Sequence, residues 1–299
     1  MMMVDPTTLT EIRVQQPDAI RRAYETRRRR GFVAEDGQLL IIAADHPARG
    51  SLRVGNRDLA MAHRADLLQR LLVALARPGV DGVLAAPDVI EDLLLLGALE
   101  DKVVIGSMNR AGLPGAVFEI DDRFTAYDPA GIDRLRLDAG KLLLRIDPGD
   151  PNTAPMLERA AQVVSSLAER RLPAMVEPFI SNRKTGALRN ELEPDAVLHS
   201  AVIAAGLGVT SAYTWLKLPV TENVDEMERV SGATTLPVVL LGGEVSDRPE
   251  QTYARWEKAL RLPSVRGLTV GRSLLYPPDD DVAAAVDVAV SLLPGRKIA

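Results

Sequence analysis

The chain has 299 residues, no cysteine, and 36 basic against 41 acidic side chains, which gives a net charge of −5. An acidic protein lacks the basic face that nonspecific nucleic-acid binding needs, and a chain without cysteine has no disulfide, thiolate zinc site or cysteine nucleophile. No run of about 18 apolar residues is free of charge, and the first residues lack a signal-peptide pattern, so we expect a cytoplasmic protein without a membrane partner.

Residues 1–37 are expected to form a helical extension ahead of the main domain, with helices around Thr8–Val14 and Pro17–Arg30. The second helix ends in four consecutive arginines, Arg27 to Arg30. Cations at the carboxyl end of a helix suit its dipole, so we interpret the run as a solvated helix end. An anion-binding or interface patch is the alternative.

Eight short apolar runs follow from residue 38 onward, each of strand length. They do not alternate between polar and apolar residues, which is typical of parallel strands buried on both faces. The predicted strands are Leu39–Ala44, Gly82–Ala86, Val103–Gly106, Lys141–Ile146, Ala174–Glu177, Thr214–Lys217, Val238–Leu241 and Leu268–Val270.

Helical patterns separate the predicted strands. Pro155–Arg170, Pro194–Ala205 and Asp279–Leu293 carry apolar residues at steps of three and four, as helices that cover a sheet do. The segment Arg110–Asp138 is instead rich in glycine and proline, which predicts a long loop with a short helix. Eight strands alternating with helices indicate the α/β class and a single (β/α)8 TIM barrel over residues 38–299.

A barrel of this kind carries its active site at the carboxyl ends of the strands. Lys217 ends the sixth predicted strand in an apolar segment, where it loses hydration; a neutral lysine amine can attack a carbonyl and form a Schiff base. The alternative is a structural lysine that pairs with a carboxylate.

Three further strand-end residues are candidate catalytic groups. Glu177, between Val176 and Pro178, is poorly solvated and suited to proton transfer. Asp45 follows the first strand, and Lys141 begins the fourth. A second ammonium near Lys217 would help to keep that lysine neutral. Salt bridges inside the barrel, or a loop cap in the case of Asp45, are the alternatives.

Glycines follow the seventh and eighth strands. Gly242 and Gly243 come after one strand, and Gly271 with Arg272 after the other. Barrels often bind a phosphate at these two strand ends, where backbone N–H groups approach it closely and an arginine adds charge-assisted hydrogen bonds. Glycines that serve only the turns are the alternative.

The histidines do not converge in the predicted fold. His63 and His199 fall in predicted helices, and only His46 stands at a strand end. A zinc enzyme normally needs two or three converging histidines, so we predict no metal and no cofactor.

The ordered set of strand-end segments resembles the class I aldolase superfamily. That superfamily includes the tagatose-1,6-bisphosphate, archaeal-type fructose-bisphosphate and deoxyribose-phosphate aldolases. The resembling segments are Ala43–His46 with Arg49 and Gly50, Gly140–Leu144 with Asp147 and Pro148, Val176 and Glu177, Trp215–Lys217 with Pro219 and Val220, Gly242–Ser246, and Val270–Arg272. The resemblance spans roughly residues 38 to 293 and departs from tagatose-bisphosphate aldolase at His46-Pro47-Ala48, which bears on substrate recognition.

The resemblance implies a metal-independent lyase that cleaves or forms a C–C bond in a sugar phosphate. Lys217 would form the Schiff base, with Glu177, Asp45 and Lys141 as further catalytic residues. The residues expected to bind the substrate or its phosphate are His46, Arg49, Gly242, Gly243, Gly271 and Arg272.

The chain looks most similar to an actinobacterial-style family of deoxyribose-phosphate aldolase-like barrels associated with inositol catabolism. That likeness implies 5-dehydro-2-deoxy-6-phosphogluconate as the substrate and a homo-oligomer as the assembly. Transaldolase-type transfer and a noncatalytic barrel that binds sugar phosphates are the alternatives.

Overall fold

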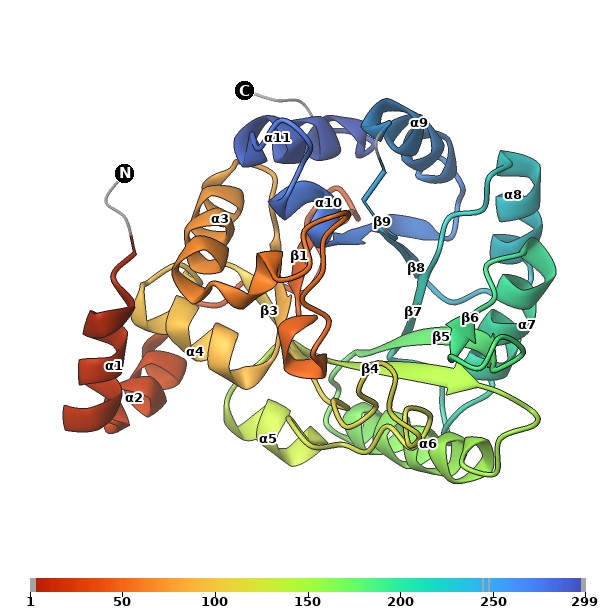
Figure 1. The fold of residues 1–299 in the computed structure, drawn as a ribbon, viewed down its shortest axis with the longest axis horizontal. Coiled ribbons are helices and arrows are strands. Elements are labelled where there is room, and N and C mark those ends of the chain that lie inside the picture. Colours follow the sequence, from red (N-terminus) through yellow and green to blue (C-terminus); the bar gives the residue numbers. More distant parts are fainter. Residues whose placement is uncertain (1–3, 244, 247, 297–299) are drawn as a thin grey trace.

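The computed structural model describes residues 4–243, 245, 246 and 248–296. Eight parallel strands form a closed barrel, because each strand pairs with the next in chain order and the last pairs with the first (Figure 1). The barrel strands are β1 (Leu39–Ala44), β2 (Gly82–Ala85), β3 (Val103–Ser107), β4 (Ala139–Ile146), β5 (Ala174–Asn182), β7 (Thr214–Leu218), β8 (Val238–Leu241) and β9 (Val265–Val270).

The predicted (β/α)8 TIM barrel is therefore confirmed, and the strand positions differ from the prediction mainly at their ends. β5 runs beyond the predicted Glu177 to Asn182. The added residues pair antiparallel with the short β6 (Arg189–Asn190), which forms a hairpin above the barrel rather than a ninth barrel strand.

Helices surround the barrel (Figure 1). Those ahead of the first strand are α1 (Pro6–Gln15) and α2 (Asp18–Thr26). The others are α3 (Arg64–Ala76), α4 (Pro87–Leu95), α5 (Pro129–Arg134), α6 (Thr153–Glu169), α7 (Pro194–Ala205), α8 (Val224–Gly232), α9 (Pro249–Ala259), α10 (Arg272–Leu275) and α11 (Val282–Leu292), with the 3-10 turns η1 (Pro47–Arg49) and η2 (Ala60–Ala62) after β1. The predicted short helix in the loop after β3 is α5.

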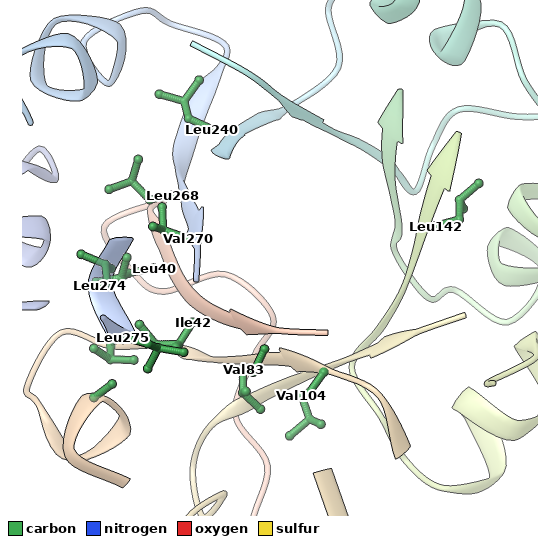
Figure 2. Packing of buried hydrophobic residues seen from close by; sticks show 14 of the residues in the cluster. Leu40, Ile42, Val83, Val104, Leu142, Leu240, Leu268, Val270, Leu274 and Leu275 are labelled. Carbon is green, nitrogen blue, oxygen red and sulfur yellow. The ribbon is translucent and has the colours of Figure 1, made fainter. Parts of the chain in front are cut away.

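The hydrophobic core has two layers, because successive side chains of a strand point to opposite faces. On β1, Leu40 and Ile42 belong to the outer layer, which packs against the helices, whereas Leu39 and Ile41 belong to a separate inner layer. Figure 2 shows the outer layer, in which Leu40, Ile42, Val83, Leu268 and Val270 lie with Leu274 and Leu275 of α10. The same alternation decides which polar residues enter the barrel.

The arginine run follows α2 rather than ending it, and the interpretation as a solvated helix end is wrong for Arg27, whereas Arg28 and Arg29 are exposed. The helix stops at Thr26, and Arg27 is buried, with its guanidinium bonded to the carbonyls of Lys102 and Arg136 at 2.8 Å. Arg27 also pairs with the buried Asp138 at 3.1 Å. The run lies across the amino end of the barrel, a position that its local pattern gave no means of predicting.

Candidate active site

A cavity of about 550 Å³ opens at the carboxyl ends of the barrel strands. Strand alternation explains its lining: the inner layer includes Ala43 of β1, Ala139 of β4 and Met175 of β5. Counting on by twos from these residues gives the inward positions Asp45, Lys141 and Glu177, which all line the cavity. Every residue that we predicted for the site lines this cavity: Asp45, His46, Arg49, Lys141, Glu177, Lys217, Gly242, Gly243, Gly271 and Arg272.

Four of these side chains form a continuous chain of alternating charge. Lys217 Nζ donates to Glu177 Oε1 at 2.8 Å, and Lys141 Nζ lies 2.5 Å from the other oxygen, Glu177 Oε2. Lys141 Nζ also donates to Asp45 Oδ2 at 3.1 Å. The members come from β7, β5 and β4 and from the residue after β1, and all four are buried. One carboxylate thus holds both ammonium groups.

The neighbouring charges and burial shift the pKa values of Glu177, Asp45 and Lys141. Burial by itself raises the pKa of Glu177, but Lys141 and Lys217 outweigh it and bring the pKa to about 2. Burial likewise raises the pKa of Asp45, yet Lys141 and Arg110 hold it well below its ordinary value. For Lys141, burial lowers the pKa more than the two carboxylates raise it. Both carboxylates are therefore charged at neutral pH.

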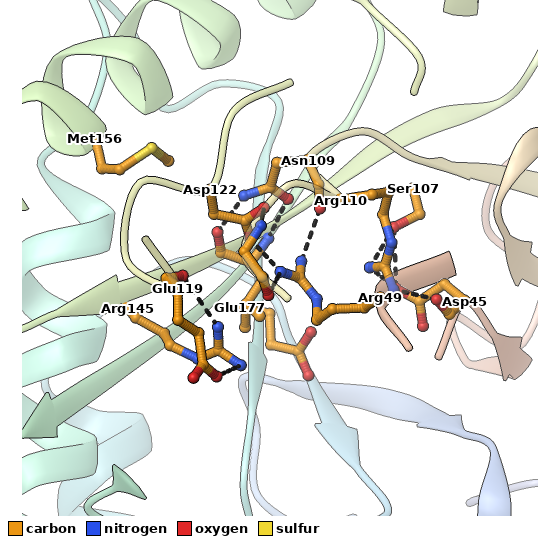
Figure 3. Close-up of polar contacts among 12 residues, drawn as sticks. Asp45, Arg49, Ser107, Asn109, Arg110, Glu119, Asp122, Arg145, Met156 and Glu177 are labelled. Carbon is orange, nitrogen blue, oxygen red and sulfur yellow. Dashed lines mark hydrogen bonds and ion pairs between the residues drawn. The ribbon is translucent and has the colours of Figure 1, made fainter. Parts of the chain in front are cut away.

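Asp45 is held by two residues at and after the end of β3, of which the sequence pointed to Ser107 but not to Arg110. Arg110 Nη1 pairs with Asp45 Oδ2 at 2.9 Å, and Arg110 Nη2 donates to the backbone oxygen of Asp45. Ser107 Oγ donates to the same Oδ2 at 2.9 Å (Figure 3). Three donors, including Lys141, therefore occupy Oδ2. The position of Ser107 at a strand end indicates from sequence that it can reach the site. The position of Arg110 depends on the path of a loop, which the sequence pattern does not predict.

Arg49 lines the cavity, but its guanidinium binds the loop after β3. It donates to the carbonyls of Asn109 and Gly112 at 2.7 and 2.8 Å, and it pairs with Asp122 at 2.5 Å (Figure 3). A Cβ at Gly112 would lie 3.0 Å from the Arg49 guanidinium, so the glycine makes room for this contact. Its substrate-binding role stays a prediction; the visible contacts fix the loop.

A second arginine, the half-buried Arg145, holds the same loop from β4. Arg145 lies 3.2 Å from Glu119 Oε1 and donates to the Glu119 backbone oxygen at 3.4 Å (Figure 3). Glu119 also accepts from the backbone N–H of Gly115 at 2.9 Å. Arg145 and Glu119 both line the cavity, so this loop forms part of its wall. Sequence reasoning missed the pair because its members are far apart in the chain.

The glycines after β8 and β9 lie at the opposite side of the cavity from β4. A Cβ at Gly271 would come within 2.2 Å of the Ala43 carbonyl oxygen, and one at Gly242 within 2.6 Å of Val270 Cγ1. Gly243 has a φ of +68°, which favours glycine. Nearby, the hydroxyls of Thr269 and Ser273 are buried without a hydrogen-bond partner in the described chain. Glu244 lies outside the described residues.

His46 lies between Asp45, which belongs to the charged group around Lys217, and Gly271, which follows β9. Its Nδ1 is buried without a hydrogen-bond partner and lies 3.9 Å from Asp45 Oδ1. A Cβ at Gly271 would be 3.2 Å from His46 Cε1, so the ring packs closely on that glycine. The other histidine near a helix start, His63, caps α3 by accepting from the N–H of Asp66 at 3.1 Å.

No group of three or more histidine, cysteine, aspartate or glutamate side chains in residues 4–243, 245, 246 and 248–296 is arranged to hold a metal ion. No helix in that part of the chain is long and apolar enough to cross a membrane.

Comparison with known structures gives matches at high and at low sequence identity. A crystal structure of Cgl0159 from Corynebacterium glutamicum is 54% identical, with 96% of each chain covered and a TM-score of 0.93. An archaeal fructose 1,6-bisphosphate aldolase is 21% identical over 87% of this chain and 95% of its own, with a TM-score of 0.65.

A Schiff base forming fructose-1,6-bisphosphate aldolase is 22% identical over 87% of this chain and 96% of its own, with a TM-score of 0.66. These two matches show a barrel fold shared with class I aldolases. The comparison with curated proteins gave no match. The family model described as Cgl0159-like matches residues 37–290, and the chain belongs to that family.

Proposed function

We propose that this chain is a class I aldolase that cleaves or forms a C–C bond in a sugar phosphate through a Schiff base on Lys217. One observation carries the proposal: two buried lysines share the carboxylate of Glu177, and one of them also contacts Asp45. Both cations are lysines, whose amines become nucleophiles once they lose a proton, and they line the cavity at the carboxyl ends of the strands. The arrangement joins a nucleophile, a proton carrier and a second cation around one cavity.

Schiff-base formation begins when the neutral amine of Lys217 attacks the substrate carbonyl carbon. Glu177 Oε1 is already hydrogen-bonded to Lys217 Nζ, so it is the group that takes the proton the amine must lose. The former carbonyl oxygen takes up one proton from solvent to become the carbinolamine hydroxyl, and Glu177 then returns its proton to that hydroxyl, which leaves as water. Lys141 on the other oxygen favours the charged carboxylate and so helps the second transfer.

Bond cleavage follows from the iminium, which accepts the electron pair of the breaking C–C bond and becomes an enamine on Lys217. A substrate hydroxyl loses its proton at the same time and becomes the carbonyl of the departing fragment. Asp45 orients or deprotonates that hydroxyl, since its Oδ1 is the oxygen not occupied by Ser107, Arg110 or Lys141. Protonation of the enamine and hydrolysis release the second fragment.

The substrate's phosphate is assigned to the ends of β8 and β9. Gly243 has open space beside its Cα, where an anion can approach the backbone, and Arg272 supplies a cation that lines the same cavity. The hydroxyl of Thr269, which also lines the cavity and has no hydrogen-bond partner among the described residues, gives a further donor. No metal ion or organic cofactor is required for this chemistry.

Borohydride trapping tests the proposal directly. The protein is treated with borohydride in the presence of one compound at a time, and its peptides are then analysed by mass spectrometry. The compounds are fructose 1,6-bisphosphate, tagatose 1,6-bisphosphate, dihydroxyacetone phosphate, deoxyribose 5-phosphate and 5-dehydro-2-deoxy-6-phosphogluconate. We expect an adduct on the peptide containing Lys217. Lys217→Met should abolish it, whereas Lys141→Met should keep it on Lys217 but form it more slowly.

The other outcomes separate the alternatives. An adduct on Lys141 would contradict the assignment of the nucleophile. No adduct with any compound, from a folded protein that binds sugar phosphates, would favour a noncatalytic barrel. A Lys217 adduct whose release requires an added aldehyde acceptor would favour transaldolase-type transfer over simple cleavage.

A further inference from the structure

The imidazole of His46 presents its two nitrogens to different surroundings. Nδ1 is closed off from solvent, has no hydrogen-bond partner among the described residues, and lies 3.9 Å from Asp45 Oδ1. Nε2 makes no hydrogen bond within the described chain and is not among the enclosed unpartnered atoms. The side chain keeps 25% of its surface exposed and lines the cavity, so Nε2 is the nitrogen a substrate can reach.

The neighbouring carboxylate decides which nitrogen carries the proton. A lone pair on Nδ1 would point toward the negative Asp45 at 3.9 Å with nothing to bind, whereas an N–H is attracted to it. The favoured neutral form therefore has its proton on Nδ1 and its lone pair on Nε2. In that form the cavity receives a hydrogen-bond acceptor from His46.

The surrounding charges keep the ring neutral. Burial lowers the pKa of His46, Arg272 and Lys217 lower it further, and Asp45 and Glu177 only partly oppose them, so the pKa is about 3. A neutral acceptor is unsuited to binding a phosphate, because the phosphate oxygens at neutral pH are themselves almost all acceptors. His46 thus differs in chemistry from Arg272, with which we grouped it as a substrate- or phosphate-binding residue.

We propose that His46 is a specificity residue whose Nε2 accepts a hydrogen bond from a substrate hydroxyl on the carbon next to the carbonyl that reacts with Lys217. The inference rests on the proposed function and narrows its substrates to α-hydroxycarbonyl phosphates. The carboxylate chain around Lys217 and the anion-binding strand ends lie on either side of His46, so a group between carbonyl and phosphate subsites would meet it.

The first test measures the tautomer without any ligand. The chain has three histidines, so comparison of the ¹⁵N imidazole signals with those of His46→Phe identifies His46. We expect a neutral ring protonated at Nδ1 from pH 5 to 8. A ring protonated at Nε2, or one that takes up a proton within that range, would overturn the inference.

The second test compares ribose 5-phosphate with deoxyribose 5-phosphate, which lacks only the hydroxyl on the carbon next to the carbonyl, on the side that leads to the phosphate. Calorimetric binding to the wild-type protein should favour the hydroxylated compound about three- to tenfold, as expected for one neutral hydrogen bond. His46→Gln, whose amide oxygen reaches the Nε2 position, should keep most of this preference. His46→Asn, which reaches only the Nδ1 position, should lose it.

These outcomes are distinct from those of the proposed function. A borohydride adduct on Lys217 together with an equal preference in wild type and His46→Asn would overturn the role of His46 alone. A hydroxyl preference that depends on His46, in a protein that forms no adduct, would support that role and contradict the aldolase. Binding of neither compound would overturn the role of His46.

Discussion

Both ends of the barrel hold buried carboxylates, but their partners differ. At the amino end, Asp81 and Asp138 stand just before β2 and β4, and each accepts a backbone N–H from the neighbouring strand, at 2.7 and 2.8 Å. At the carboxyl end, Asp45 and Glu177 are held by side chains. Asp81 and Asp138 therefore take part in the backbone hydrogen bonding of the sheet. Within the described chain, the carboxylates of Asp45 and Glu177 bind only side chains, so they can exchange those partners for a substrate.

The cations differ in the same way. Asp81 pairs with Arg30 and Arg296, both at 2.7 Å, and Asp138 pairs with Arg27 and Arg29. Arginine stays charged under all ordinary conditions and binds carboxylates with a rigid fork.

Lysines occupy the corresponding positions at the carboxyl end, where Lys141 and Lys217 share Glu177. A lysine can lose its proton when buried and become a nucleophile. We call the amino-end carboxylates Asp81 and Asp138, with their arginines, the clamp. The comparison therefore separates this permanently charged clamp from a carboxyl-end network suited to proton transfer, and the following substitutions test the difference.

The largest expected effect is that of Lys217→Arg. Arginine keeps the positive charge beside Glu177 but cannot form the Schiff base, so turnover of a trapped substrate should fall by at least on the order of 10⁴-fold. The melting temperature should change little, because the ion pair is retained. Full turnover in this variant, measured by release of the aldehyde fragment, would show that charge alone matters at this end of the barrel too.

Asp138→Asn should have the opposite signature. It leaves Arg27, whose side chain is 2% exposed, as a buried charge without its carboxylate, which costs about 3–5 kcal/mol of unfolding free energy. Turnover per folded molecule should stay unchanged. The measurement is urea denaturation beside an activity assay.

Asp101→Asn is the matched control for that variant. Asp101 pairs with Arg28 of the same arginine run, but the two side chains are 59% and 67% exposed. Removing such a pair should cost less than about 1 kcal/mol. Equal losses in the two variants would show that burial of the clamp is not what stabilises the amino end.

The positions of the cavity residues in this comparison were largely readable from the sequence, and the contacts of the amino-end arginines were not. Asp45, Lys141, Glu177 and Lys217 lie at the carboxyl ends of strands whose apolar runs were plain, and the period of two along each strand places them inward. The geometry of a parallel barrel then brings them to one cavity. Local pattern and fold class were enough.

The remaining features depend on contacts between distant segments. Arg27 meets Asp138 across 111 residues, and Arg145 meets Glu119 through a loop whose path no periodicity records. Arg110 is likewise in an irregular segment, although it holds Asp45. For such residues the sequence shows a charge but not its partner, so a buried clamp looks the same as a solvated helix end.

A smaller effect than that of Asp138→Asn is expected in the response of the two ends to acid. His46 has a folded pKa of about 3 and an unfolded one of about 6.5, so below pH 6.5 the unfolded chain binds a proton that the folded chain does not. Stability should therefore fall as pH drops, by about 1.4 kcal/mol per pH unit, or about 2 kcal/mol between pH 7 and pH 5.

His46→Phe removes this titration, so its unfolding free energy should depend less on pH over the same interval, whatever its value at pH 7. Glu177, with its pKa lowered to about 2, loses its stabilising charge only at lower pH, below its unfolded value of about 4.3. The clamp arginines do not titrate in this range. A wild-type slope that His46→Phe leaves intact between pH 7 and pH 5 would place the acid-sensitive group elsewhere and remove one difference between the ends of the barrel.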